Sequence, residues 1–566
     1  MKTLFRNGTI VPGSTESDAL CTCMIIEDDR IVYVGNDEPI SLEGYKVVDL
    51  EGKKILPGFI DGHMHLLLFG ASLSKIDLGA CTSLASIRST IQSAARARPN
   101  ASRLFCRGWM HSMTDGAALA SMLDDLDPRP IFIDSKDLHS AWCNTPALRE
   151  LGLLDAATSP PDPAGGVIHR DPVTGTATGL ISETAAVNIV WPHVAKVASP
   201  DEKLAFIRDA VSAYNAAGYT GMIEMATDEN LWDTMKLLRA REPVPIRLAA
   251  HWIIAPKDSE GEVFAQVDHA IALHEEFNRE TSPDFRIAGI KLICDGVVDA
   301  CTAALMEPYA ATDADTTGDM LWKPDILRKV VHRADGAGLQ CALHAIGDAA
   351  VQMALDALES CSTVVDGAGS RDRRHRIEHL ELTRPGDAAR LARLGITASV
   401  QPVHADPAIL RAWPKLLGEE RCRRAFAYRE FVDEGATLAI GTDSPTAPHW
   451  PLRNVYTAVT RRSAREPDSR EVVNKGFALG LMQAVGAATA GSAYSCFAEG
   501  VVGRLGVGMR ADFVVLDMEL GEGGSIPTTP SIQKYINHSL ALYFPLKSKH
   551  TSPSTSPNHS KSSLSR

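Results

Sequence analysis

Hydrophobic stretches of two kinds alternate along most of this chain. Between residue 55 and about residue 490, short apolar runs are followed by longer segments in which apolar residues recur every three or four positions. The short runs predict buried strands and the longer segments predict amphipathic helices. Strands that alternate with helices in this way are typical of parallel strands joined by helical connections.

One connection shows the pattern well. The sequence Ser-Pro-Asp-Glu at 199–202 is a capping box with proline at the first helical position. The helix that follows has one apolar face, Gly218 ends it, and a strand is predicted at 219–225. A second helix is predicted from Lys323 to Gly338, directly before the strand that carries His344.

Several such units in series predict an α/β fold, a (β/α)8 TIM-type barrel over residues 57–490. An open doubly wound sheet is less favoured, because polar residues of metal-binding types recur at the predicted strand ends. No Gly-x-Gly-x-x-Gly turn follows a strand, so a dinucleotide site has no support. Residues 75–185 interrupt the order, and we interpret them as an insertion that covers the mouth of the barrel.

Both ends of the chain lie outside this repeating pattern. Residues 1–56 predict short strands with turns, which form a β-module too small to be stable alone. A strand predicted within 491–525 is expected to return to that module. Residues 526–566 are rich in Ser, Pro, Lys and Asn and are expected to be irregular or disordered.

The first predicted barrel strand ends in two histidines, His63 and His65. Side chains two positions apart on a strand point to the same side. Both imidazoles can therefore reach one metal ion, and neutral imidazole is the commonest metal-binding side chain. Two histidines in a solvated turn are the alternative interpretation of this pair alone.

Other candidate ligands follow further apolar runs. The carboxyl ends of parallel strands meet at one face of a barrel, where catalytic groups collect. A set of histidines, an aspartate and a lysine at these positions predicts a metal site instead of scattered polar residues. The four residues that extend the set beyond the first strand are Lys291, His344, His379 and Asp443. Glu378 is expected to point away from His379, because neighbours on a strand face opposite sides.

Composition limits the partners and the compartment. The 566 residues carry a formal net charge of −13 with no basic cluster on a candidate helix, which argues against nucleic acid or an anionic membrane as the partner. The N-terminus has no continuous apolar stretch as long as that of a signal peptide, and no apolar segment is long enough to span a membrane. Eleven cysteines without disulfide spacing indicate buried thiols, so a cytoplasmic location is expected. A homo-oligomer remains open.

Taken together, the motifs resemble those of the amidohydrolase superfamily, and specifically its amidohydrolase-3 (YtcJ-like) branch, which includes N-substituted formamide deformylase. The order and the local context of the motifs both match over residues 1–516. The matching segments are 57–65 (PGFIDGHMH), 108–109 (GW), 139–144 (HSAWCN), 165–171 (GGVIHRD), 178–183 (TGLISE), 290–296 (IKLICDG), 344–348 (HAIGD), 376–379 (RIEH), 441–445 (GTDSP) and 506–513 (GVGMRADF).

The resemblance implies a metal-dependent barrel with a small β-sandwich built from both chain ends. It implies that His63 and His65 bind a first metal and that His344 and His379 bind a second. Asp443 would contact the first metal and the reactive water. Lys291 stands where many members carry a carboxylated lysine that bridges two metals, and without carboxylation it would be an ordinary cation.

These ligands predict a hydrolase that cleaves a carbon–nitrogen bond other than a peptide bond, in an amide or an N-substituted formamide, by metal-activated hydroxide. The metal is expected to be one or two divalent ions, with zinc favoured by the histidine-rich shell. Asp443 is the expected catalytic proton carrier. Trp109 and His139 are expected to bind the small-molecule substrate if the insertion folds over the mouth, with structural packing as the alternative for each.

Two other functions stay open. Ring deaminases of the same superfamily typically carry a glutamate three residues after the fifth-strand histidine, and that position here is Gly347. Amide hydrolysis is therefore favoured over deamination. A catalytically inactive binding protein on the same barrel would be expected to show degraded ligands, whereas all six positions are intact.

Overall fold

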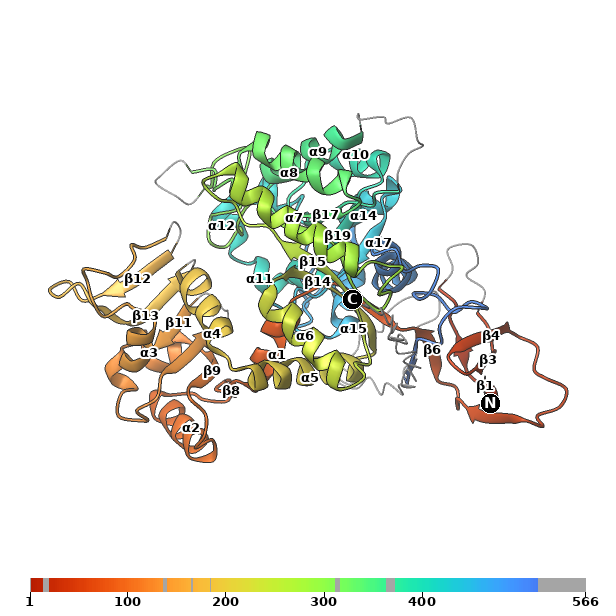
Figure 1. Ribbon diagram of the computed structural model, residues 1–566, viewed down its shortest axis with the longest axis horizontal. Coiled ribbons are helices and arrows are strands. Elements are labelled where there is room, and N and C mark those ends of the chain that lie inside the picture. Colours follow the sequence, from red (N-terminus) through yellow and green to blue (C-terminus); the bar gives the residue numbers. More distant parts are fainter. Residues whose placement is uncertain are drawn as a thin grey trace, which may run out of the picture.

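A computed structural model shows three parts: a central barrel, an insertion domain on one side and a β-sandwich on the other (Figure 1). His139 and the predicted tail at 526–566 lie outside the described residues. The structure describes residues 2–13, 20–135, 140–163, 166–183, 185–310, 316–362 and 372–517.

Eight parallel strands form the barrel, in the sheet order β20-β19-β18-β17-β16-β15-β14-β7. A parallel bridge between Met64 and Ser444, next to the two outermost strands, closes the ring. The sequence prediction of a (β/α)8 barrel is thereby confirmed. The strands are β7 (Phe59–Met64), β14 (Tyr219–Thr227), β15 (Arg247–Ile253), β16 (Phe285–Ile293), β17 (Gln340–Ala345), β18 (Arg376–His379), β19 (Thr397–Val400) and β20 (Leu438–Ile440).

Helices surround the barrel and bury their apolar faces against it. The capping box forms as predicted: the Ser199 hydroxyl accepts a hydrogen bond from the Glu202 N–H, and the Glu202 carboxylate accepts one from the Ser199 N–H. The main outer helices are α1 (Leu66–Ser74), α5 (Pro200–Ala216), α6 (Glu229–Arg241), α7 (Glu260–Glu276), α8 (Pro324–Gly336), α9 (Asp348–Ser362), α10 (Asp387–Leu394), α14 (Tyr428–Asp433), α15 (Pro451–Thr460), α16 (Leu481–Gly486) and α17 (Ser492–Ser495).

The insertion domain has its own six-stranded sheet, in the order β12-β13-β11-β10-β9-β8, and its own apolar cores. In Figure 1 it lies on the same side of the barrel as α1 and α11 (Pro407–Leu410), which follow the carboxyl ends of β7 and β19. Its elements are β8 (Ile76–Asp77), α2 (Leu84–Ala97), β9 (Leu104–Trp109), β10 (Ile131–Ser135), β11 (Ser140–Cys143), α3 (Thr145–Glu150), β12 (Gly166–Arg170) and β13 (Ala177–Glu183), with α4 (Trp191–Val197) following.

The β-sandwich joins the two ends of the described chain. One sheet has the order β4-β3-β1-β5 and the other the order β2-β6-β21. The rings of Phe5 and Phe513, from opposite ends of the sequence, pack edge to face with centroids 5.2 Å apart. The strands are β1 (Lys2–Arg6), β2 (Thr9–Ile10), β3 (Cys23–Glu27), β4 (Arg30–Gly35), β5 (Tyr45–Asp49), β6 (Lys54–Pro57) and β21 (Phe513–Leu516).

Candidate metal centre

The His-x-His segment reaches the barrel mouth through close backbone contacts. A Cβ on Gly62 would lie 2.7 Å from the Ile440 carbonyl oxygen, so only glycine lets β7 approach β20 this closely. The buried Asp61 carboxylate then joins the two strands, because it accepts hydrogen bonds from the N–H groups of His63 and Thr442. The Asp-Gly-His motif therefore fixes where His63 stands relative to the eighth strand.

Glu378 orients His63. Its carboxylate Oε2 lies 2.8 Å from His63 Nδ1, and both side chains are buried. A carboxylate only accepts, so Nδ1 carries the hydrogen and His63 Nε2 keeps a free lone pair. Buried Arg376 binds the same carboxylate, with its Nε 2.8 Å from Glu378 Oε1.

Glu378 and His379 are neighbours at the end of β18, and both lie against His63. His379, the next residue, has a positive φ of 76°. This left-handed conformation breaks the strand alternation, so Glu378 contacts His63 while the His379 ring lies 5.0 Å, centroid to centroid, from the ring of His63.

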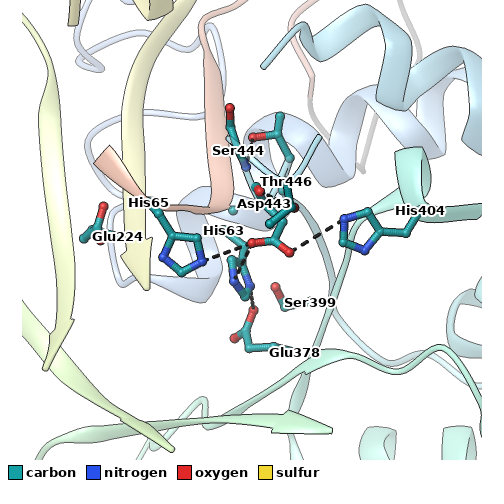
Figure 2. Close-up of polar contacts among 12 residues, drawn as sticks. His63, His65, Glu224, Glu378, Ser399, His404, Asp443, Ser444 and Thr446 are labelled. Atoms are coloured by element: carbon teal, nitrogen blue, oxygen red, sulfur yellow. Dashed lines mark hydrogen bonds and ion pairs between the residues drawn. The ribbon is translucent and has the colours of Figure 1, made fainter. Parts of the chain in front are cut away.

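Asp443 lies between three histidines, as Figure 2 shows. Its Oδ1 is 3.1 Å from His65 Nε2 and 3.6 Å from His63 Nε2. Its Oδ2 is 3.6 Å from His404 Nε2. Donor atoms of His63, His65 and Asp443 all lie within 4.8 Å of one another, so one cation can contact all three.

The remaining predicted ligands lie beside this group. The rings of His344 and His379 have centroids 4.3 Å apart. Lys291 is 2 % exposed, and its Nζ has no hydrogen-bond partner among the described residues. Burial lowers the pKa values of His63 and His344, and the charge of Lys291 contributes to both shifts. The structure thus brings all six predicted ligands together, and their binding of metal stays a prediction.

Burial favours the neutral form of two of the predicted ligands, His63 and His344. It lowers the pKa of His63 to about 4 and that of His344 to about 3, so both are neutral at pH 7. Burial also lowers the pKa of Lys291. A neutral imidazole set with an aspartate fits a divalent transition-metal ion. The unpartnered lysine nitrogen fits as well, because carboxylation would turn a costly buried cation into an anionic ligand.

Two further buried acids, Asp295 and Glu224, contact the residues around the site. Asp295 accepts backbone hydrogen bonds from Ile346 and Gly347, and its Oδ1 is 3.5 Å from His344 Nε2. Glu224 accepts a hydrogen bond of 2.5 Å from the N–H of Leu66, the residue after His65. Burial raises the pKa of Glu224 to about 8. Glu224 thus supports the backbone next to His65, whereas Asp295 lies beside the ring of His344.

Sequence reasoning missed His404 and Glu381. His404 lies on a short 3-10 turn, η4 (Pro402–Ala405), after β19, and its Nδ1 is 3.2 Å from Glu381 Oε1. His404 is four residues beyond Val400, where the seventh strand ends. A polar residue close after a barrel strand was the available signal, and it was weak because the turn separates His404 from the strand itself.

Of the two predicted substrate contacts, the structure describes Trp109. Trp109 is 0 % exposed in the core of the insertion domain, and its indole N–H donates to the Thr114 hydroxyl. Its ring also packs against Trp142. This burial fits packing, the alternative that the sequence left open, and a contact between Trp109 and substrate stays a prediction. His139 lies outside the described part of the chain.

Comparisons with known proteins agree with this geometry. The chain is 31 % identical to Protein LONG AFTER FAR-RED 3 of Arabidopsis thaliana, over 91 % of this chain and 86 % of the relative. It is 28 % identical to the putative amidohydrolase YtcJ of Bacillus subtilis, over 91 % of this chain and 94 % of the relative. It is 23 % identical to the N-substituted formamide deformylase of Arthrobacter pascens, over 89 % of this chain and 91 % of the relative.

A solved structure, an uncharacterized metal-dependent hydrolase from Pyrococcus furiosus, superimposes with a TM-score of 0.73 at 25 % identity, covering 92 % of this chain and 99 % of the other. The Amidohydrolase family profile matches residues 46–529. This match covers most of the barrel, the insertion and the returning strand β21. The chain belongs to the amidohydrolase family and is a metal-dependent hydrolase of that superfamily.

Proposed function

We propose that this protein hydrolyses the carbon–nitrogen bond of small amides, with N-substituted formamides as the first class to test. The observation that carries the proposal is the convergence of His63, His65 and Asp443 beside a buried, unpartnered Lys291. The similarity to a formamide deformylase over most of both chains supports the substrate class.

His63, His65 and Asp443 would hold one divalent ion, and His344, His379 and carboxylated Lys291 would hold a second. We favour zinc because the donor set is rich in imidazole. When bound, such an ion polarises the scissile carbonyl and makes water a stronger acid. The chain's own residues supply the remaining steps.

Asp443 is the group that moves the proton. Burial raises its pKa, but the interactions with His63 and His65 outweigh burial and hold the pKa well below its usual range. It is therefore a carboxylate at neutral pH and can take a proton from the attacking water. Delivering that proton to the leaving nitrogen gives a carboxylic acid and an amine, which then exchange a proton with solvent.

Ring deamination is disfavoured by the site as well as by the sequence. A Cβ on Gly347 would lie 2.0 Å from the Ala304 carbonyl oxygen. The backbone leaves no space for a side chain there, so the acid that deaminases use at this position has no room. Amide hydrolysis needs no such acid.

The partners that we propose are small molecules. No helix in the described ranges is both long and apolar enough to cross a bilayer. The eleven cysteines are all free thiols, which supports our proposal of a reducing compartment such as the cytoplasm.

Metal content and product release test the proposal together. Protein purified without added metal is expected to carry two ions per chain. It is expected to release equal amounts of formate and amine from N-butylformamide, with acetamides of the same amine as a second substrate. Lys291→Met is expected to carry one ion less. Fully loaded protein that releases no amine from any formamide or acetamide would contradict the proposal, and ammonia from a ring substrate would favour deamination.

A further inference from the structure

A buried arginine, Arg461, lies at the C-terminal end of α15, the outer helix that follows the eighth barrel strand. Its side chain is 0 % exposed. Its Nε donates a hydrogen bond to the Val473 carbonyl, whereas neither Nη1 nor Nη2 has a hydrogen-bond partner among the described residues. Burial lowers the pKa of Arg461, but a guanidinium still carries its positive charge at neutral pH. The interior therefore holds a cation with two unused NH2 groups.

No carboxylate forms an ion pair with Arg461 within the described ranges. Apart from burial, the neighbouring group that acts on its pKa is the phenol of Tyr428, which is neutral at pH 7. The guanidinium carbon lies 5.2 Å from the centroid of the Tyr428 ring, which is a cation–π contact. This ring and the carbonyl end of α15 offset part of the cost of burying the charge. They provide no acceptor for Nη1 or Nη2 and no counter-ion.

Two neighbouring side chains add further unused donors. Thr457 lies one helical turn before Arg461, whose backbone N–H donates to the Thr457 carbonyl, and the Thr457 hydroxyl has no partner among the described residues. Gln401 follows β19, and its side-chain amide is likewise unpartnered there, while its backbone carbonyl accepts a hydrogen bond from the Tyr428 hydroxyl. Thr457 is 0 % exposed and Gln401 is 1 % exposed. Tyr428 thus borders both Arg461 and Gln401, in a part of the interior where unused donors outnumber unused acceptors.

We propose that Arg461 Nη1 and Nη2 bind a small monovalent anion, chloride, with the Thr457 hydroxyl and the Gln401 amide as further donors. A water molecule would accept hydrogen bonds from the guanidinium but would leave its charge unbalanced, and an unbalanced buried charge is costly. An anion meets both needs at once. The burial of all three side chains limits the ligand to a small ion. None of the three is a predicted metal ligand, so the inference is independent of the proposed function.

The anion would stabilise a helix that supports the mouth of the barrel. α15 also carries the buried Asn454, whose Oδ1 accepts a hydrogen bond from the Val403 N–H and whose Nδ2 donates to the Gly441 carbonyl. Val403 follows the seventh strand, and Gly441 follows the eighth, just before Asp443. One end of α15 therefore joins two strand ends beside the metal centre, and Arg461 lies at the other end. Neutralising Arg461 is expected to stabilise the folded barrel.

Thermal unfolding in chloride tests the proposal. Tm is measured at constant ionic strength while sodium gluconate is replaced by sodium chloride. Gluconate is too large for a site without exposed surface, so the series separates binding from charge screening. The wild-type protein is expected to gain about 2 °C for each tenfold rise in chloride above Kd. The same gain in metal-free protein would exclude chloride binding to a metal ion. Crystals grown in sodium bromide are expected to show an anomalous peak beside Nη1 and Nη2.

Arg461→Met keeps an unbranched side chain and removes the charge. It is expected to lose both the chloride dependence and the bromide peak. In gluconate alone it is expected to unfold at a higher temperature than the wild type, because an unbalanced buried cation has been removed. Arg411→Met is the matched control, since it removes an arginine that is paired with Glu466 and Glu471 at the surface. This variant should keep the full chloride dependence.

Three results would overturn the proposal. A wild-type Tm that is independent of chloride at constant ionic strength would favour bound water at Arg461. A chloride dependence that persists in Arg461→Met would place the anion elsewhere, as would bromide peaks at surface arginines alone. If Arg461→Met does not fold, the bromide peaks of the wild-type crystals decide between a site at Arg461 and no such site.

Discussion

The substitution Glu378→Gln tests how Glu378 supports His63, the first predicted metal ligand. The substitution keeps the size of a side chain that is 0 % exposed, and removes the charge shared between His63 Nδ1 and the Arg376 guanidinium. One glutamine oxygen cannot serve both donors as two carboxylate oxygens do. His63 then loses its fixed tautomer, and removing such a partner typically costs about 10- to 100-fold in metal affinity.

The same substitution leaves Arg376 without its counter-charge. Arg376 is 0 % exposed and keeps hydrogen bonds to the Gly62 carbonyl and to the hydroxyls of Ser399 and Ser495. A broken buried ion pair costs about 3–5 kcal/mol, and these three remaining bonds place the expected loss near the lower end, at about 3 kcal/mol of unfolding free energy. The stability loss should appear in metal-free protein, because it arises in Arg376 and not in the metal.

Competition with a chelator measures the metal affinity, and denaturant unfolding of the metal-free protein measures stability. Glu381→Gln is the matched control, since Glu381 is also a buried carboxylate bonded to a histidine of the site. It is expected to keep the metal affinity of the wild type. Glu378→Gln with unchanged affinity, or a Glu381→Gln variant that loses as much, would refute the reasoning that Glu378 orients a metal ligand.

Removing the metal with a chelator should lower the unfolding free energy by about 4 kcal/mol at a free metal concentration 1,000 times Kd, measured as a fall in Tm, and an unchanged Tm would count against a resident ion. Lys291→Met should raise the Tm of the metal-free protein while it abolishes the second ion, because an unpartnered buried ammonium is replaced by an apolar group. Gly347→Ala should destabilise the protein by about 1–3 kcal/mol through its clash with Ala304, and a wild-type Tm would show that the turn can relax. Trp109→Ala should cost the insertion domain about 3–5 kcal/mol, seen as faster proteolysis of residues 75–185, whereas Trp109→Phe should retain the wild-type KM. A raised KM in Trp109→Phe would instead support Trp109 as a substrate contact.

Part of the candidate site could be predicted from the sequence. Each predicted ligand stands at or just beyond the end of an apolar run, and parallel strands of one barrel all end at one face. Local pattern alone therefore brought His63, His65, Lys291, His344 and Asp443 to a common place. The capping box at 199–202 was equally predictable, because its hydrogen bonds join residues three apart.

Other features depend on contacts that no local pattern contains. Strand alternation predicts that Glu378 points away from His379, whereas both lie against His63 where His379 adopts a positive φ. His404 becomes part of the site only because the turn after β19 folds back toward Glu381. Trp109 is buried by the insertion's own core, a packing choice that its aromatic character left open.

The sequence by itself determined the order of strands and helices, the barrel and the ligand positions, because these follow from periodicity and from the polarity of strand ends. Only the tertiary structure decided which side chains support the predicted ligands. Glu378 meets His63 across 315 positions of the chain, and β21 pairs with β6 from the opposite end of the described residues. Such contacts depend on which strands become neighbours and on the backbone angles at their ends. The local hydrophobic pattern specifies neither of these.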